Sequence, residues 1–161
     1  MKAIFATDEA GGMGLNGGLP WPKMRGDLAH FARTTGKGLV IMGRGTYESS
    51  MPMPLPNRKC VVLSRTLGHV RPGVILARAV ADLDYHIQHY HLTPWVIGGG
   101  MVLRELWSQI TEVSLTVIDG TFEADTRFDI NPSGEFFAPF LLHSEQRHPT
   151  DPFRVQHWIR K

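Results

Sequence analysis

Asp27 is the one acidic side chain in a stretch of 18 residues that reads GLNGGLPWPKMRGDLAHF, from position 14 to position 31. A carboxylate at the edge of an apolar pocket has a raised pKa and takes up a polar ligand or a proton. Spacing alone leaves a second interpretation open, because acids are also favoured in the first turn of a helix. Asp27 is therefore either a ligand-binding carboxylate or a residue that stabilises a helix start.

The segment before Asp27 combines mobile and rigid backbone. Gly14, Gly17 and Gly18 permit backbone angles closed to other residues, whereas the prolines at 20 and 22 fix theirs. Around Asp27, four residues recur at helical spacing and predict an inward stripe, namely Leu28, Phe31, Ala32 and Thr35. Asp27 stands one turn before Phe31, so a carboxylate and a phenyl ring can face the same cavity.

Three further features follow predicted strands and carry glycine, hydroxyl or arginine groups. They are residues 43–46 (GRGT), the pair Ser64-Arg65, and the triple glycine at 98–100. In parallel sheets ligands bind beyond the carboxyl ends of the strands, and backbone N–H groups at helix starts bind phosphates. Any one of these glycine turns can equally be a tight connection. Together they indicate a polyphosphorylated cofactor along one sheet edge, although neither the G-x-G-x-x-G fingerprint nor a Walker-type loop is present.

Histidines and the single cysteine give weaker signals. His86, His89 and His91 invite a metal interpretation, but no thiol or carboxylate pattern completes a ligand set, and a solvated helix end accounts for them better. We predict no metal site. Cys60 lies in an apolar run and is interpreted as a small core residue rather than a nucleophile.

Apolar runs bounded by glycines predict strands that alternate with helices over the first two-thirds of the chain. The predicted strands are residues 3–7, 39–42, 58–64, 74–76, 95–97, 113–118, 136–142 and 153–159. Besides the helix that begins near Asp27, helical patterns cover residues 47–50, 79–90 and 102–110, and the prolines of 51–56 exclude regular structure there. This order predicts an α/β fold with a largely parallel sheet and an antiparallel edge from the last two strands.

Composition places the chain among ordinary single-domain proteins. It has 161 residues, 42% hydrophobic and 20% charged, with a formal net charge of +2. That charge suits a phosphorylated small molecule and is too small for a nucleic-acid surface. One cysteine allows no internal disulfide, which favours a reducing compartment. We expect no signal peptide and no membrane span, hence a cytoplasmic protein, and a monomer because no apolar stripe is left over.

Over nearly its whole length the chain resembles dihydrofolate reductases. The matching segments are 14–21 (G-x-x-G-x-L-P-W), 27–31 (DLAHF), 40–46 (VIMGRGT), 55–59 (LPNRK), 63–65 (LSR), 96–100 (VIGGG) and 115–119 (LTVID). The resemblance implies a single-domain fold spanning 1–161, with a central eight-stranded, mostly parallel mixed sheet, an antiparallel C-terminal edge and about four flanking helices. It also implies NADPH-dependent reduction of 7,8-dihydrofolate to tetrahydrofolate, supplying one-carbon and thymidylate metabolism, and binding of antifolate inhibitors.

The resemblance also implies roles for individual residues. Asp27 would hold the pterin's 2-amino group and ring N–H, Thr116 would orient that carboxylate, Trp21 would hold an ordered water, and Leu19 would close over the nicotinamide. Arg58 would grip the carboxylate of the glutamate tail. The implied substrate-binding residues are Ile4, Phe5, Ala6, Asp27, Leu28, Phe31, Ser50, Leu55, Arg58, Ile97 and Thr116.

The implied cofactor site follows the sheet edge. Arg44, Thr46, Ser64 and Arg65 would bind the 2′-phosphate side of NADPH, and the triple glycine would meet the pyrophosphate and nicotinamide through a cis peptide between its first two residues. The full implied set is Ala6, Gly14, Leu15, Gly18, Leu19, Gly43, Arg44, Gly45, Thr46, Leu63, Ser64, Arg65, Ile97, Gly98, Gly99, Gly100, Met101, Val102 and Leu103.

Four positions depart from the family's usual pattern. The family often has an aromatic residue where His30 stands and a tyrosine where Leu103 stands, an isoleucine at Ser50, and a basic or polar residue at Gly45. We therefore expect altered strength of folate and antifolate binding. Two alternatives stay open from the sequence: a same-fold pterin or pyrimidine reductase of riboflavin-type synthesis, and a non-catalytic NADPH-binding module. Asp27 and Arg58 favour folate, and the set of Trp21, Asp27 and Thr116 favours an enzyme.

Overall fold

The computed structural model describes all 161 residues. The elements in chain order are β1 (Lys2–Asp8), β2 (Gly12–Gly14), α1 (Arg25–Thr35), β3 (Leu39–Gly43), α2 (Arg44–Tyr47), β4 (Lys59–Leu63), β5 (Val74–Ala77), α3 (Val80–Tyr90), β6 (Pro94–Gly98), α4 (Gly100–Leu106), the 3₁₀ turn η1 (Trp107–Gln109), β7 (Glu112–Ile118), β8 (Thr126–Arg127), β9 (Phe140–Arg147) and β10 (Phe153–Arg160).

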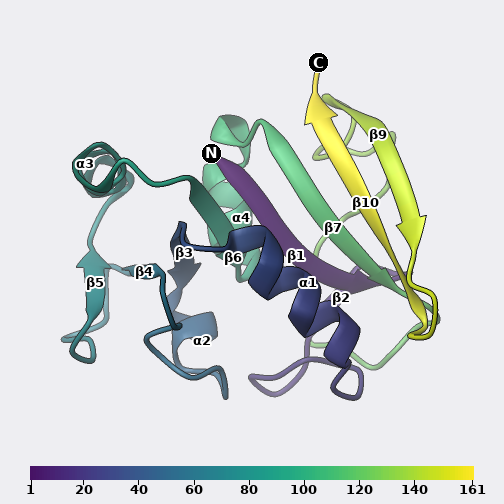
Figure 1. Ribbon diagram of the computed structural model, residues 1–161, viewed down its shortest axis with the longest axis horizontal. Coiled ribbons are helices and arrows are strands. Elements are labelled where there is room, and N and C mark those ends of the chain that lie inside the picture. Colours follow the sequence, from purple (N-terminus) through teal and green to yellow (C-terminus); the bar gives the residue numbers. More distant parts are fainter.

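Eight strands form one twisted sheet in the order β5-β4-β3-β6-β1-β7-β10-β9 (Figure 1). The pairings from β5 across to β7 are all parallel. The last two strands, β10 and β9, run antiparallel to their neighbours. The predicted eight-stranded mixed sheet with an antiparallel C-terminal edge and four helices is confirmed.

The two faces of the sheet are covered by different elements. In Figure 1, α1 lies in front of the central strands and α4 behind them. The larger core, behind the sheet, joins β-strand side chains to α4, α3 and the aromatic residues around Trp107. The smaller core on the α1 side gathers Ile4, Val40, Met42, Cys60 and Ile97. Because parallel strands are buried on both faces, their sequences are continuous apolar runs rather than alternating ones.

The short second helix begins earlier than the sequence predicts. Residues 47–50 were expected to be helical, yet α2 spans Arg44–Tyr47 and follows β3 directly, with Gly43 at its N-cap. The prediction for residues 47–50 is therefore wrong. Gly43 and Gly45 masked the helix start because glycine is a poor helix former.

The inward face of α1 also differs from prediction. Leu28 is 41% exposed and Ala32 is exposed, so the stripe through these two residues is wrong. The residues that turn towards the sheet include Asp27, His30 and Phe31, which are half-buried, while Thr35 is the one fully buried residue of the helix. Helical spacing identifies the helix correctly, but it cannot tell an apolar side chain at an open edge from one in the core.

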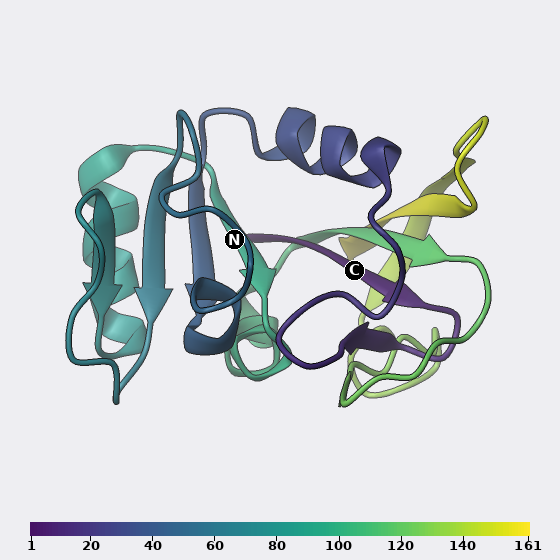
Figure 2. The same ribbon diagram turned by 90° about the horizontal axis from the view of Figure 1, so that it is seen from below.

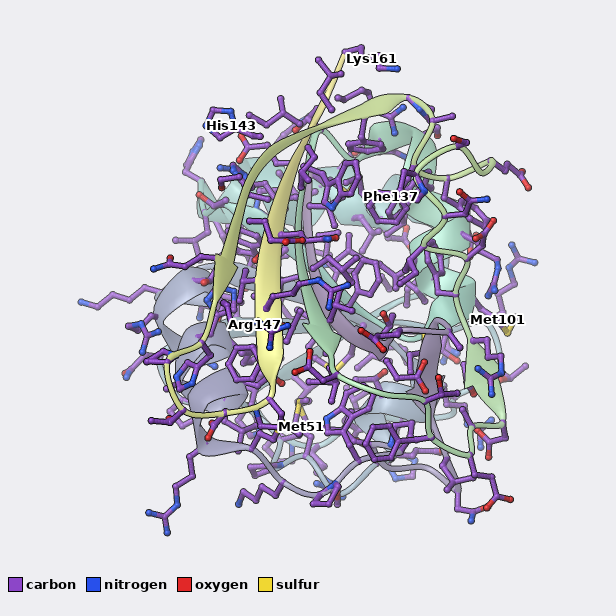
Figure 3. The ribbon with its side chains drawn as sticks, turned by 90° about the vertical axis from the view of Figure 1, so that its right-hand side faces the viewer. Met51, Met101, Phe137, His143, Arg147 and Lys161 are labelled. Carbon is purple, nitrogen blue, oxygen red and sulfur yellow. The ribbon has the colours of Figure 1, made fainter.

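The C-terminal hairpin is shifted relative to prediction. The strand expected at 136–142 begins only at Phe140, because residues 136–139 form turns that place Phe137 in the core. β10 keeps an unbroken register with β7, so Trp158, paired with Val113, faces the larger core, while Ile159 lies on the opposite face and is exposed. The β-bulge lies in β9, where His143 has no partner in the register with β10, and the alternation of β10 itself is unchanged. Figure 3 shows β9 as the outer strand, with His143 and Arg147 at its exposed edge.

Candidate functional site

Asp27 lies in the first turn of α1, opposite Thr116 on β7. Burial raises the pKa of the Asp27 carboxyl above its ordinary value, and a side-chain hydrogen bond with Thr116 lowers it in part. Thr116 is almost completely buried and belongs to the strand that pairs with β1 and β10 at the centre of the molecule. The carboxyl thus sits over the middle of the sheet rather than on the outer surface.

This environment bears on the two interpretations of Asp27. An acid that only completes a helix start is stabilised as the anion by the helix dipole, which lowers its pKa. The pKa of Asp27 is raised instead, with desolvation as the leading cause. A carboxyl that is costly to ionise in the free protein is suited to bind a group that donates hydrogen bonds or carries a proton.

Apolar side chains flank Asp27 on the α1 side of the sheet. Ile4, Leu55 and Ile97 are buried in the same cluster, and Phe31 of α1 packs against it. Ala6, two residues after Ile4 on β1, packs against Trp21. These side chains form an apolar surface next to the Asp27–Thr116 pair.

Phe5 does not belong to this apolar surface. Its ring points to the other face of the sheet, where it packs edge-to-face with Trp107 at 6.3 Å and with Phe128 at 5.3 Å between ring centroids. Successive side chains of a strand point to opposite faces, so the neighbour of Ile4 must do this. The assignment of Phe5 to the substrate site stays a prediction, and it applies to the backbone of Phe5 because the ring faces the other side of the sheet.

Arg58 stands at the far end of α1 from Asp27. Its Nε donates to the backbone oxygen of Gly36 at 3.0 Å, and its guanidinium lies 5.7 Å from the centroid of the Phe31 ring. Arg58 also lines a shallow open hollow with Leu55, Asn57 and other residues of the loop before β4. A cation held this way between α1 and β4 can receive a carboxylate from the same side as Asp27.

Trp21 and Leu19 belong to the link between β2 and α1, which runs along the same sheet edge as α2 (Figure 2). Trp21 is buried against Ile118 and Phe153, with its ring 6.2 Å from that of Phe122. Leu19, in contrast, is 51% exposed. The link is therefore anchored at Trp21 and free to contact a ligand at Leu19.

The tip of this link is tied to a segment that sequence patterns did not single out. The N–H of Asn16 donates to Asp125 Oδ2 at 2.8 Å, and Asp125 N–H donates to the Gly14 carbonyl at 2.9 Å. Asn16 and Gly17 both have positive φ, so the glycine-rich sequence serves a tight turn here. Gly14, Leu15 and Gly18 form this turn, in which Leu15 and Gly18 exchange backbone hydrogen bonds.

The glycine turns meet at the carboxyl edge of the sheet. The peptide between Gly98 and Gly99 is cis, as the resemblance implied. Cβ atoms added at these two positions would meet only the hydroxyl of Thr46, at 3.6 Å and 3.7 Å, and one added at Gly45 would meet nothing within 4 Å. Gly43 is tighter, because an added Cβ would lie 2.8 Å from Val102 Cγ2. Backbone amides and one hydroxyl thus surround an open space.

Arginine side chains lie beside this space. Arg44 Nε donates to Glu48 Oε1 at 3.0 Å and its NH1 group donates to Thr66 Oγ1 at 3.1 Å, which joins α2 to the loop after β4. Arg65 is exposed and lies 3.4 Å from Glu105 of α4. Ser64 is buried, and its Oγ accepts the N–H of Leu67 at 3.1 Å. Its oxygen is therefore already used, and only its hydroxyl proton is free for a ligand.

The remaining cofactor positions divide by exposure. Met101 is 84% exposed at the start of α4, while Leu63, Val102 and Leu103 are buried in the core behind the sheet. The side chain of Leu103 is completely buried in this core. The assignment of Leu103 to the cofactor site stays a prediction, and its buried side chain leaves only the backbone for such a contact.

Arg78 was missed by the sequence analysis. Its guanidinium donates to the carbonyls of Ser64, Arg65 and Gly68 at 3.4 Å each, and also to that of Leu67. It therefore shapes the loop that presents Ser64 and Arg65. Its position directly after β5, at the carboxyl edge shared with the glycine turns, is the signal that could have identified it.

The side chains considered for metal binding or nucleophilic chemistry have other surroundings. On α3, His89 stacks on Tyr85 and His86 stacks on Tyr90, with ring centroids 5.8 Å and 6.5 Å apart. Cys60 is buried, its Sγ accepts the N–H of Leu55 at 3.3 Å, and burial raises the pKa of the thiol. The interpretation of Cys60 as a core residue is confirmed.

Comparisons with known proteins point to one family. A sequence model described as dihydrofolate reductase matches residues 1–156. The chain is 37% identical over 137 residues to dihydrofolate reductase type 8 of Escherichia coli, which covers 81% of this chain and 80% of that protein. It is also 37% identical over 145 residues to dihydrofolate reductase of Rattus norvegicus, covering 80% of this chain and 78% of that one.

A solved structure agrees with the sequence matches. Dihydrofolate reductase from Enterococcus faecalis, complexed with NADP(H) and RAB-propyl, superposes with a TM-score of 0.86 and 29% identity, covering 99% of this chain and 95% of that one. Separately, none of the helices has the length and apolar character that crossing a membrane requires.

Proposed function

The chain belongs to the dihydrofolate reductase family, and on that premise we propose which of its side chains carry out the reaction. The chain is an NADPH-dependent oxidoreductase that reduces 7,8-dihydrofolate to tetrahydrofolate. The observation that carries the assignment of roles is the burial of the Asp27 carboxyl beside Thr116 and an apolar cluster, and this burial raises its pKa. Asp27 and Arg58 favour folate over the ribosyl-phosphate substrate of a riboflavin-type reductase, because that substrate has no glutamate tail.

We propose that Asp27 binds the pterin ring. Its two carboxylate oxygens would accept hydrogen bonds from the 2-amino group and the adjacent ring N–H, the two-oxygen grip that carboxylates offer. Thr116 would hold the carboxyl in the orientation this requires. Leu28, exposed on α1, would be covered by the ligand, together with Ser50 and Phe31. Arg58 would bind the tail carboxylate, and antifolate inhibitors would occupy the same slot.

The residues at the carboxyl edge suit NADPH. Open space at Gly45, Gly98 and Gly99 lets a ligand approach the backbone closely, and Arg44 and Arg65 supply positive charge there. We propose that Thr46 and Ser64 add hydroxyl donors to the phosphates. When bound, NADPH supplies the hydride that the pterin accepts at C6.

The protein's own part in the reaction is orientation and exclusion of water. Leu19 would close over the site, and Trp21, fixed in its apolar cluster, would hold the water that protonates N5. Protonation at N5 makes C6 the better hydride acceptor. Holding both reactants in one geometry is where most of the rate enhancement arises, since the cofactor carries the difficult chemistry.

We further propose that the 161 residues act as one domain and as a cytoplasmic monomer. Strands from β1 to β10 belong to one sheet, which supports a single folding unit. Cys60 is buried and has no partner for a disulfide, which supports a reducing compartment.

The test is the fall in NADPH absorbance after dihydrofolate is added to the purified protein and its variants. Asp27→Asn loses one charge-assisted hydrogen bond to the pterin and places the amide NH₂ of the asparagine opposite an N–H donor of the pterin. Together these changes weaken transition-state binding by about 2.5–6 kcal/mol. We therefore expect kcat/KM to fall about 10²- to 10⁴-fold at neutral pH, with the Kd of NADPH unchanged. Asp84→Asn, an exposed acid on α3, is the matched control and should behave as wild type. Undiminished turnover of Asp27→Asn would refute the assigned role.

A further inference from the structure

His30 lies one helical turn after Asp27 and is bound to the sheet by its ring. Its Nε2 is 2.9 Å from Ser114 Oγ on β7, and its Nδ1 is 3.4 Å from Thr34 Oγ1 on the next turn of α1. A hydroxyl can donate or accept, so these two partners satisfy both ring nitrogens of a neutral imidazole in either tautomer. Both ring nitrogens of His30 thus have hydroxyl partners that bind the neutral imidazole.

The His30–Ser114 contact joins α1 to β7 in the same way as the Asp27–Thr116 contact, one helical turn further along α1. Ser114 and Thr116 are two residues apart on β7, so they point to the same face of the sheet, and both are buried. Asp27 and His30 are three residues apart on α1 and lie on the same side of the helix. Two polar pairs therefore connect α1 to β7 side by side.

Few apolar contacts hold α1 in place otherwise. Leu28 and Ala32 are exposed, and Thr35 is the only fully buried residue of the helix. Its hydroxyl is turned back to the carbonyl of Phe31 at 2.8 Å, within α1 itself. The distance between the first two turns of α1 and β7 consequently depends on the polar pairs, and Phe31 makes the main apolar contact of the helix with the smaller core.

We propose that His30 is a positioning residue for Asp27. Its hydrogen bond to Ser114 holds α1 against β7 so that the Asp27 carboxyl meets Thr116 at the height the pterin requires. This inference rests on the proposed role of Asp27, and it assigns a function to a histidine at a position where the family often has an aromatic residue.

The charged groups around His30 favour its neutral form. Burial lowers the pKa of His30, and the positive charge of Arg33 on the same helix lowers it further. On β7, Glu112 is paired with Lys2 of β1 at 3.0 Å and with His157 of β10 at 3.4 Å, so its charge is already balanced. His157 lies opposite Ser114 in register, and His143 of β9 lies beyond it, with its ring 5.6 Å from that of His157. Protonating His30 in acid therefore adds a positive charge one turn from Asp27.

The experiment compares variants that remove or keep the hydrogen bond. His30→Leu and Ser114→Ala each remove it, while His30→Gln keeps an amide that reaches Ser114 and cannot titrate. We expect each loss to raise the KM for dihydrofolate about 2- to 10-fold, the worth of one net hydrogen bond, with the Kd of NADPH unchanged. His30→Gln should stay within about twofold of wild type at pH 8. His89→Leu and Ser144→Ala, at exposed positions on α3 and β9, are the matched controls.

Two readouts separate positioning from a merely structural role. Because the two residues act through one contact, the double variant should be no worse than the poorer single variant. The pH profile of the dihydrofolate KM should contain an acid step in wild type, below the ordinary pKa of histidine, that is missing in His30→Gln. A uniform loss of thermal stability without these two signatures contradicts the proposal.

Asp27→Asn, measured in the same assay, keeps the two proposals apart. If Asp27→Asn loses activity while His30→Leu and Ser114→Ala keep the wild-type KM for dihydrofolate, the inference about His30 is wrong and the function stands. If Asp27→Asn is as active as wild type, the proposed role of Asp27 has failed, whatever the His30 variants do.

Discussion

Replacing Gly43 by alanine should destabilise the protein, whereas the same replacement at Gly45, two residues on, should stabilise it. The Cβ of an alanine at position 43 would lie 2.8 Å from Val102 Cγ2 and 3.7 Å from the Gly99 nitrogen. Carbon atoms prefer about 3.5–4.0 Å, so Val102 would have to retreat by roughly 1 Å. Val102 is β-branched and buried at the start of α4, so the shift must move α4 as well.

The magnitude follows from this geometry. Overpacking of a buried contact costs about 1–3 kcal/mol, which for a chain of this size lowers Tm by about 2–12 °C. At Gly45 an added Cβ meets nothing within 4 Å, and the residue is inside α2. Alanine there should gain about 0.5–1 kcal/mol, because glycine is the poorer helix former.

Thermal and urea denaturation of the two variants is the assay, with NADPH titration alongside. Gly43→Ala should also weaken NADPH binding, since it displaces α4 next to the Gly98–Gly99 turn. Equal stability of Gly43→Ala and wild type, or a shift of the same sign in both variants, would refute the reasoning about this turn.

Three further predictions concern single side chains. Asp27→Asn should raise the free energy of unfolding at pH 7. The folded-state pKa of Asp27 lies above its unfolded value, so the protonated carboxyl contributes stability at low pH, and this contribution is lost as the pH rises through the folded pKa. Denaturation of wild type and variant from pH 3 to pH 8 should show a gain that vanishes at the acid end, with each tenfold change in proton affinity worth about 1.4 kcal/mol. Arg44→Ala should raise the Kd of NADPH about 10- to 100-fold and leave that of NADH nearly unchanged, as binding titrations with both cofactors would reveal. Ser50→Ile should strengthen antifolate inhibition about 3- to 30-fold through added apolar burial, and identical inhibition constants before and after the change would end the idea.

The parallel part of the sheet could be predicted because two features of the sequence identify its strands, an apolar run and a glycine turn after it. Residues 39–42 and 95–97 are apolar runs that end in glycine, and each is followed by a turn into a helix. Such runs bury both faces of a strand, which is typical of parallel sheets. The carboxyl-edge location of Gly43, Ser64 and Gly98 follows from the same alternation.

Other features depend on contacts that local patterns do not contain. The β-bulge at His143 of β9 arises in the pairing of β9 with β10, and the sequence of one strand alone does not contain it. Leu28 and Ala32 have helical spacing but are exposed. The His30–Ser114 hydrogen bond joins residues 84 positions apart, so no reading of either segment alone could reveal it.

Binding of the pterin depends most directly on the ionisation of Asp27. An NMR titration of ¹³C-labelled aspartate carboxyls can follow this ionisation, and the Asp27→Asn variant assigns the signal. In the free protein the midpoint should lie above the ordinary value for aspartate, about 3.9, and adding folate should move it, because the bound pterin donates hydrogen bonds to the carboxylate. An ordinary midpoint that folate leaves unmoved would contradict the central claim that Asp27 is the buried acid that holds the pterin.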